Sequence, residues 1–262
     1  MKIAVCLKQV PDTTDLRLDP ETNTLIREGV EAVLNPLDEF PLEAALQLRE
    51  AQGGKVTAFT MGPPQARRVL HKAIAMGADQ GVLVSDRKFA GADTWSTSLT
   101  LARAIEKLGP FDLVLCGKQA IDGDTAQVGP GIATHLGEPQ VTYVTRIEPI
   151  DATHLRVQRL LENGTATVEV RLPAVLTVLK EANEPRLPTL GGRLRAFHST
   201  PQTADAALLG LAEEEVGLAG SPTRVVRIAV PETNRGRTRI EGDPAESATA
   251  LLAGLRERGV EV

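Results

Sequence analysis

Short apolar runs alternate with helix-like stretches over the first 140 residues, and this alternation limits the fold more than any other feature. Four runs have the unbroken hydrophobic character of strands that are buried on both faces: residues 3–7, 56–61, 81–84 and 111–116. The stretches between them carry apolar side chains at helical spacing and end at glycines. We therefore predict an α/β fold with a doubly wound, mostly parallel sheet, a Rossmann-like nucleotide-binding domain.

Two helix starts can be placed from the residues that precede them. Asn35 and Pro36 are expected to open the first helix, because Asn is a preferred N-cap residue and Pro suits the first turn. Asp93 or Thr94 is expected to cap a later helix that ends near Gly109.

The pattern changes near Val141. Residues 155–161 and 165–172 predict two paired strands around Asn163-Gly164, a dipeptide typical of β-hairpins. The stretch 183–192 contains two prolines and two glycines, so we expect neither a helix nor a central strand there. Residues 244–258 have the pattern of an amphipathic helix. We expect a nucleotide-binding domain with β-hairpin additions over residues 1–182, and over residues 183–262 an extended C-terminal arm that wraps another surface.

Composition excludes several classes of function. The net charge of −5 gives no reason to expect nucleic acid, and no apolar run approaches the roughly 20 residues that span a bilayer. The chain starts directly with a strand pattern and no signal peptide, so we expect a cytoplasmic protein with reduced cysteines. We expect no metal site, because the cysteines and histidines lack ligand spacing: Cys6, Cys116, His71, His135, His154 and His198.

A ligand is expected beyond the carboxyl ends of the strands, where the strand order reverses. The loops that follow these ends are residues 8–14, 61–63, 85–94 and 117–128. The last of them is expected to enter a helix capped by Asp124 or Thr125, and free N–H groups at a helix start favour a phosphate. A plain strand-to-helix loop explains the same residues equally well. The sequence contains no P-loop and no catalytic constellation, and we predict no catalytic residue.

Seven segments occur in one family in the same order and spacing: residues 5–12 (VCLKQVPD), 34–36 (LNP), 60–63 (TMGP), 75–79 (AMGAD), 117–127 (GKQAIDGDTAQ), 172–175 (LPAV) and 183–186 (NEPR). Through them the chain resembles the beta subunit of electron transfer flavoprotein over essentially its full length. The resemblance implies a heterodimer with an alpha subunit, which holds most of the electron-carrying FAD and is wrapped by the C-terminal arm. It also implies electron transfer from acyl-CoA or related dehydrogenases, as in fatty acid oxidation, towards a quinone oxidoreductase.

The resemblance further implies a nucleotide in the α/β domain. Carried over position by position, its contacts would be Cys6, Asn35, Pro36, Leu37, Asp38, Met61, Gly117, Lys118, Gln119, Ala120, Ile121, Asp122, Gly123, Asp124, Thr125, Ala126, Gln127 and Val128. The commonest members bind AMP, and residues 183–186 look like that type. Residues 85–87, 91–94 and 123–130 look more like electron-bifurcating members, in which a second FAD replaces AMP and lies near Thr94 and Thr97. The interpretation leans to AMP and leaves the second FAD open.

One loop resembles the family's recognition loop, which docks on acyl-CoA dehydrogenases through an exposed leucine. That leucine corresponds to Leu190, within residues 185–192. The alternative is a leucine tucked against its own protein or the alpha subunit. Thr13 stands where many members place a tyrosine near the alpha-held flavin.

Two other classes share parts of this pattern. A stand-alone nucleotide-binding regulator of the universal-stress type has a similar α/β core, but the long stretch after Val178 speaks against it. An ATP pyrophosphatase needs a glycine- and serine-rich loop after the first strand, and residues 8–12 do not form one.

Overall fold

The computed structural model describes residues 1–12, 32–226 and 239–261. The chain divides into two units, Met1–Val226 and Arg227–Val262. Thr13, noted above for the tyrosine that other members place there, lies outside the described residues. In the second unit, α7 (Pro244–Glu257) confirms the amphipathic helix; Asp243 caps it by accepting hydrogen bonds from the backbone N–H groups of Ala245 and Glu246.

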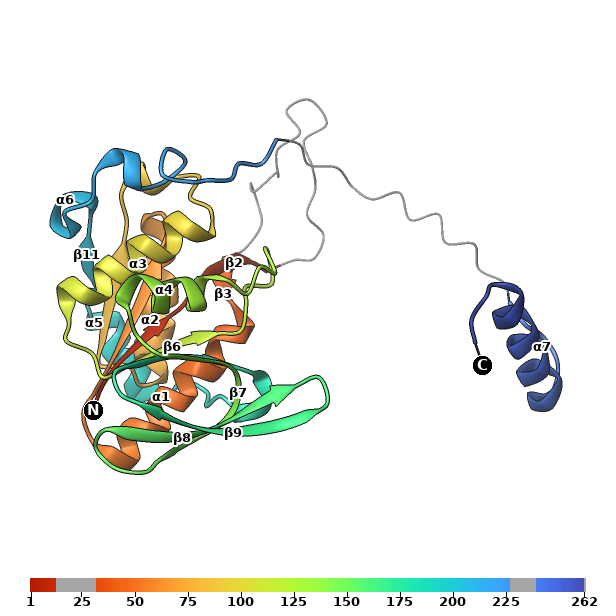
Figure 1. Ribbon diagram of the computed structural model, residues 1–262. Helices are drawn as coiled ribbons and strands as arrows, with labels where there is room; N and C mark the ends of the chain where they lie inside the picture. Colours follow the sequence, from red (N-terminus) through yellow and green to blue (C-terminus); the bar gives the residue numbers. More distant parts are fainter. Residues whose placement is uncertain (13–31, 227–238, 262) are drawn as a thin grey trace. The chain divides into compact units, whose positions relative to one another are not determined.

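The first unit is built on a nine-stranded sheet with the order β11-β5-β4-β1-β6-β10-β7-β8-β9 (Figure 1). All neighbouring strands from β11 to β7 are parallel, and β8 and β9 add an antiparallel hairpin. The doubly wound, mostly parallel fold is therefore confirmed. The strands are β1 (Lys2–Cys6), β4 (Lys55–Met61), β5 (Gln80–Val84), β6 (Leu113–Gly117), β7 (Gln140–Pro149), β8 (His154–Leu161), β9 (Gly164–Arg171), β10 (Ala174–Val178) and β11 (Gln202–Ala204). A separate antiparallel pair joins β2 (Gln9–Pro11) to β3 (Ala32–Leu34).

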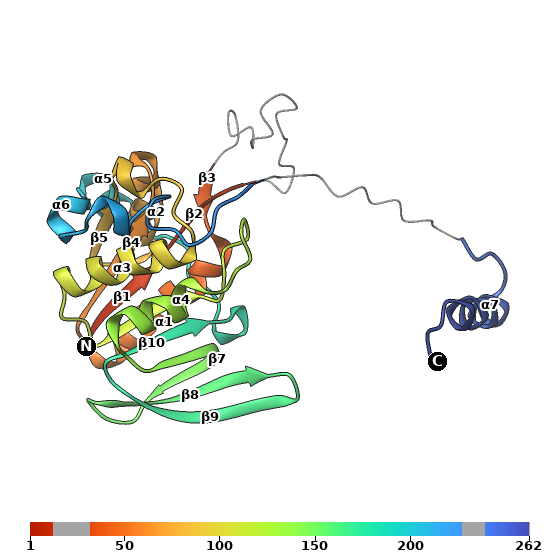
Figure 2. The same cartoon turned by 45° about the horizontal axis from the view of Figure 1, so that its top comes forward.

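Helices cover both faces of this sheet (Figure 2). Helices α1 (Glu39–Gln52) and α2 (Arg67–Met76) pack on one face, and α5 (Leu190–His198) packs on α2. Helices α3 (Thr94–Leu108), α4 (Val128–Leu136) and α6 (Ala206–Leu209) cover the other face. Single 3-10 turns complete the elements: η1 (Pro36–Asp38), η2 (Pro64–Ala66), η3 (Arg87–Phe89), η4 (Lys180–Ala182) and η5 (Glu213–Glu215).

Strand β1 shows why the central runs are apolar without interruption. Ile3 and Val5 belong to the core under α1 and α2, whereas Ala4 and Cys6 belong to the core under α3 and α4. Successive side chains of a strand point to opposite faces, so a strand covered on both sides needs apolar residues at every position.

The structure confirms two predictions made from short sequence signals, a helix cap and a hairpin. The side chain of Asp93 caps α3 by accepting a hydrogen bond from Ser96 N at 3.1 Å. The hairpin closes at Asn163-Gly164, where Gly164 has φ 142°. Both signals act within a few residues of chain, so they do not depend on the distant packing.

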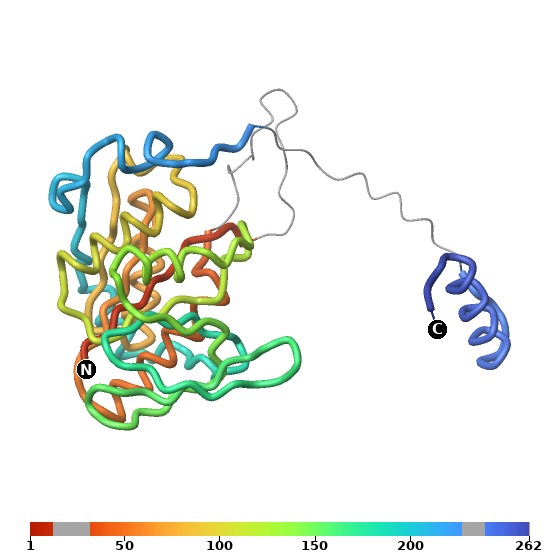
Figure 3. Tube along the Cα trace, viewed as in Figure 1, coloured from red at the N-terminus to blue at the C-terminus, as the bar shows by residue number. Residues whose placement is uncertain are grey.

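The stretch after residue 183 is more regular than predicted. Residues 190–192, expected to be irregular, open α5, because the prolines precede the helix and Thr189 Oγ1 caps it by accepting Gly192 N at 3.0 Å. Strand β11 then pairs with β5 at the edge of the sheet. Figure 3 shows the blue segment after β11 passing beside the yellow segment that leads into α3. Residues 183–226 are thus part of the first unit.

None of the described helices is long and apolar enough to cross a membrane. Within the same described ranges, no group of three or more His, Cys, Asp and Glu side chains is placed to hold a metal ion.

Candidate functional site

The strand order reverses between β1 and β6. From β1 the chain moves outward to β4 and β5, then returns to β6 on the other side of β1. Ligands of doubly wound sheets bind beyond the carboxyl ends of the strands at such a point. The two ends here are Cys6 and Gly117, and the loop that follows Gly117 is the one the sequence singled out.

Helix α4 begins later than predicted. Its first residue is Val128, its N-cap position is Gln127, and no side chain caps it. Asp124 and Ala126 have φ angles of 52° and 54°, in the left-handed region, and therefore cannot belong to the first helical turn. The prediction that Asp124 or Thr125 caps this helix is wrong: the residue types suited a cap, but the backbone there leaves the helical region.

Five consecutive backbone N–H groups at the start of α4 have no hydrogen-bond partner among the described residues, and they are called the free N–H groups below. The N–H groups of residues 125–129 donate to no other residue that the structure describes. The backbone of Ala126 is in the left-handed region and that of the next residue, Gln127, is in the right-handed helical region. Such alternation makes a concave nest of N–H groups that accepts anions, and the helix dipole of α4 adds to the attraction.

Asn35 holds this loop in place instead of capping a helix. Its side chain is fully buried (0% exposed). Asn35 Nδ2 donates to Gln119 O at 3.0 Å, and Asn35 Oδ1 accepts from Ile121 N at 3.3 Å. No side-chain capping bond is present at Asn35, and the chain first forms η1 before α1 begins. An amide side chain suits this position because its Nδ2 can donate to the backbone while its Oδ1 accepts from it.

Asp38 lies directly beneath the start of the loop. Its Oδ2 accepts a hydrogen bond from Lys8 N at 2.7 Å. A Cβ atom at Gly117 would overlap Asp38 Oδ1 and would lie 2.8 Å from Leu37 O, so only glycine fits there. Burial raises the pKa of the Asp38 carboxyl to about 7, although the Lys8 backbone donor acts in the opposite direction.

The two acidic side chains of the loop have partners. Lys8 Nζ pairs with Asp122 Oδ1 at 2.6 Å, and Gln119 Nε2 donates to Asp124 Oδ1 at 2.6 Å. These contacts neutralise or occupy the carboxylates that would otherwise repel a phosphate. Lys8 was not among the predicted contacts, although it lies in one of the segments that carry the family resemblance.

The start of α3 reaches the same loop. Thr94 Oγ1 donates to Gln127 Oε1 at 2.9 Å, and Thr97 follows within the first turn of the same helix. Met61 ends β4 in the neighbouring strand. The predicted contacts at residues 6, 35–38, 61, 94 and 117–128 therefore come from adjacent strand ends and their loops.

The two cysteines, far apart in sequence, are neighbours in space. Cys6 and Cys116 stand opposite each other in the parallel register of β1 and β6, and both are buried. The hydrogen bond with Cys6, together with burial, raises the pKa of the Cys116 thiol, and both side chains belong to the core under α3 and α4. Sequence spacing could not reveal this contact.

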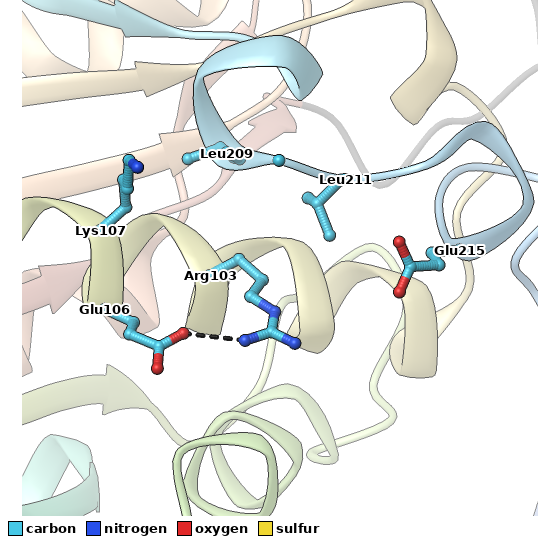
Figure 4. A pocket seen from close by; sticks show the side chains of 7 residues that line it. Arg103, Glu106, Lys107, Leu209, Leu211 and Glu215 are labelled. Carbon is cyan, nitrogen blue, oxygen red and sulfur yellow. Dashed lines mark hydrogen bonds and ion pairs between the residues drawn. The ribbon is translucent and has the colours of Figure 1, made fainter.

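The remaining features lie elsewhere. Leu190 is the first residue of α5 and is 76% exposed. A solvent-open hollow of about 480 Å³ lies between α3 and the segment around α6 (Figure 4). Arg103 on its wall pairs with Glu106 at 2.9 Å, and none of the predicted site residues lines it.

A doubly wound, mostly parallel sheet with its switch point between β1 and β6 defines a Rossmann-like α/β domain. Residues 22–209 match the family described as "Electron transfer flavoprotein domain". The chain is 49% identical to electron transfer flavoprotein subunit beta of Thermoanaerobacterium thermosaccharolyticum over 99% of this chain and 100% of that protein. It is 47% identical to the caffeyl-CoA reductase-Etf complex subunit CarD of Acetobacterium woodii, again over 99% and 100%. It is 44% identical to Protein FixA of Azorhizobium caulinodans, over 98% of this chain and 95% of that protein.

The chain belongs to the electron transfer flavoprotein family, as one of its beta subunits. The family predicted from the seven segments is confirmed. Membership implies an electron-transfer role in association with flavin and an alpha subunit as partner.

Proposed function

We propose that this chain is the non-catalytic beta subunit of a heterodimeric electron carrier that passes electrons from acyl-CoA-type dehydrogenases towards a quinone oxidoreductase. The bound flavin, held mostly by the alpha subunit, supplies the one-electron redox chemistry. This chain supplies binding, orientation and docking. The name of the Acetobacterium relative, which joins it to a caffeyl-CoA reductase, supports an electron donor or acceptor that handles CoA esters.

The site at the switch point binds an adenine nucleotide, with AMP as the first candidate. The observation that carries this proposal is the row of free N–H groups at residues 125–129, in a loop fixed by Asn35 and Asp38. Because these donors are already held in place, a phosphate meets them without a further ordering cost. The ion pair with Lys8 neutralises the negative charge of Asp122 next to these N–H groups.

A second FAD in place of AMP is the other candidate. It is supported by the Thr94–Gln127 hydrogen bond, which brings the start of α3 against the loop. Residues 85–87, 91–94 and 123–130 also resemble the electron-bifurcating members of the family. An AMP moiety is common to both nucleotides, so the same N–H groups serve either one.

Two other surfaces serve partners in this proposal. Leu190, at the first turn of α5, is the docking residue for the dehydrogenase, and its exposure supports an intermolecular contact. The arm that ends in α7 wraps the alpha subunit. Leu251 and Leu252 of α7 are exposed, as expected of a helix that covers its apolar side with a partner.

Nucleotide counting tests the function. The chain is purified together with its alpha subunit, the complex is denatured, and the released FAD and AMP are measured per heterodimer. One FAD and one AMP support the first candidate, and two FAD molecules support the second. A complex with one FAD and no further nucleotide, or a chain that never associates with a flavin-bearing partner, contradicts the proposal.

A further inference from the structure

Residues 217–223 form a strap that lies against the loop leading into α3. Leu218 N donates to Ala90 O at 2.9 Å. Gly217 has φ 57°, and a Cβ atom there would overlap Lys88 O. The close approach of the two backbones therefore requires glycine at this position.

Asp93 ties the strap to helix α3. Its Oδ1 accepts from Ser96 N at 3.1 Å and so caps the helix. Its Oδ2 accepts from both Thr223 N at 3.0 Å and Thr223 Oγ1 at 2.8 Å. The backbone N–H of Asp93 donates to Ser221 Oγ at 2.9 Å. One residue thus connects the strap to the first turn of a helix that faces the nucleotide loop.

The hydrogen bonds continue from α3 to the nucleotide loop. Thr94, next to Asp93, donates to Gln127, which lies inside the row of free N–H groups at residues 125–129. Farther along α3, an open hollow lies between the helix and residues 209–215 (Figure 4). Among the described residues, the hydrogen bonds that join the strap to the start of α3 all involve Asp93.

We propose that Ser221 and Thr223 are positioning residues for the nucleotide site, an inference that rests on the nucleotide-binding function proposed above. Through Asp93 and Thr94 they set the position of Gln127 and of the N–H groups around it. Because coupling between two sites is reciprocal, bound nucleotide stabilises the strap.

The test uses the intact heterodimer after removal of its nucleotide. AMP and FAD are titrated separately by calorimetry into the wild type and into the double variant Ser221→Ala/Thr223→Val. The variant loses the two hydroxyl contacts with Asp93 but keeps similar side-chain volumes. We expect roughly fivefold weaker binding, since exposed hydrogen bonds have a modest net strength. Thr223→Ser in place of Thr223→Val retains the hydroxyl and should restore affinity. Thr203→Val on β11 removes a hydroxyl that accepts from Arg67 Nη2 at 3.3 Å and does not bond to Asp93, so it should leave the affinity unchanged.

Hydrogen exchange in the wild type gives a second measurement that needs no variant. Saturating nucleotide should slow exchange of the Thr223 and Asp93 amides, whereas amides of α7 provide the internal comparison. If the wild type binds neither AMP nor FAD, the proposed function itself fails. If the wild type binds nucleotide while the double variant binds equally tightly, or exchange of the strap is unaffected, the positioning role is refuted.

Discussion

Asp38 should make the stability of this chain depend on pH in an unusual direction. The carboxyl is buried beneath Gly117, with one oxygen bonded to Lys8 N and no ion pair to any cation in the described ranges. Burial raises its pKa from 3.8 to about 7. The substitution Asp38→Asn keeps the shape and the acceptor for Lys8 but removes the ionisation.

The sign follows from proton binding. Between pH 4 and pH 7 the folded chain keeps a proton on Asp38 that the unfolded chain has lost. The stabilisation that the protonated Asp38 carboxyl contributes is therefore fully present below its pKa in the unfolded chain. It is lost as the pH rises through its pKa in the folded chain. The rise of this pKa from 3.8 to about 7 corresponds to about 4 kcal/mol of unfolding free energy, at about 1.36 kcal/mol for each pH unit. Between pH 4 and pH 7 the unfolding free energy of Asp38→Asn should rise relative to that of the wild type by up to about 1.4 kcal/mol per pH unit. Above pH 7 the difference should stay constant.

The assay is denaturant unfolding of wild type and variant complexes at half-unit pH steps from 4.5 to 8.5, followed by far-ultraviolet circular dichroism. Asp151→Asn is the matched control. The hydrogen bonds from Thr153 lower the pKa of Asp151 to about 2, so this group is ionised in both states over the whole pH range. The unfolding free energies of Asp151→Asn and the wild type should therefore depend on pH in the same way. Parallel curves for Asp38→Asn as well would refute the argument that burial controls this carboxyl.

Three further predictions test other parts of the structure. Gly117→Ala should cost about 1–3 kcal/mol in unfolding experiments and reduce the nucleotide content of the complex, because the new Cβ overlaps Asp38; Gly191→Ala, with no described atom within 4 Å of its Cβ position, should change neither. Arg186→Ala should lower the unfolding free energy by roughly 2–3 kcal/mol, because it leaves the buried Glu43 without its partner at 2.8 Å; an unchanged midpoint would contradict this. Leu190→Ala should slow reduction of the carrier by its dehydrogenase in stopped-flow measurements and leave flavin content unchanged; equal rates would remove the docking assignment.

Much of the fold could be predicted because its signals are local. Unbroken apolar runs revealed the central strands, Asn163-Gly164 revealed the hairpin, and Asp93 revealed the start of α3. Strand β11 was not predicted, because it has only three residues, two of them exposed and polar. It becomes a strand through its pairing with β5. A strand that exists only through a distant partner leaves little trace in its own sequence.

The site was predicted in position but not in detail. The loop after Gly117 was found because strand ends at a switch point bind ligands. The start of α4 was placed too early because Asp124 and Thr125 are good capping residues. Asp also tolerates the left-handed backbone that Asp124 adopts, but Ala126, which adopts it too, gives no sign of it in its residue type. The strap of residues 217–223 was missed because its partner, Asp93, lies more than a hundred residues away in sequence.

Three of the seven segments that carry the family resemblance converge on one set of contacts. Lys8 comes from the first, Asn35 from the second, and Gly117 opens the fifth. In the folded chain Lys8 pairs with Asp122 of the fifth segment, and Asn35 holds the backbone of that same segment. Segments with no contact in the sequence thus form a single bonded frame around the free N–H groups. A site whose donors are fixed by bonds within the chain spends less of its interaction energy on ordering itself.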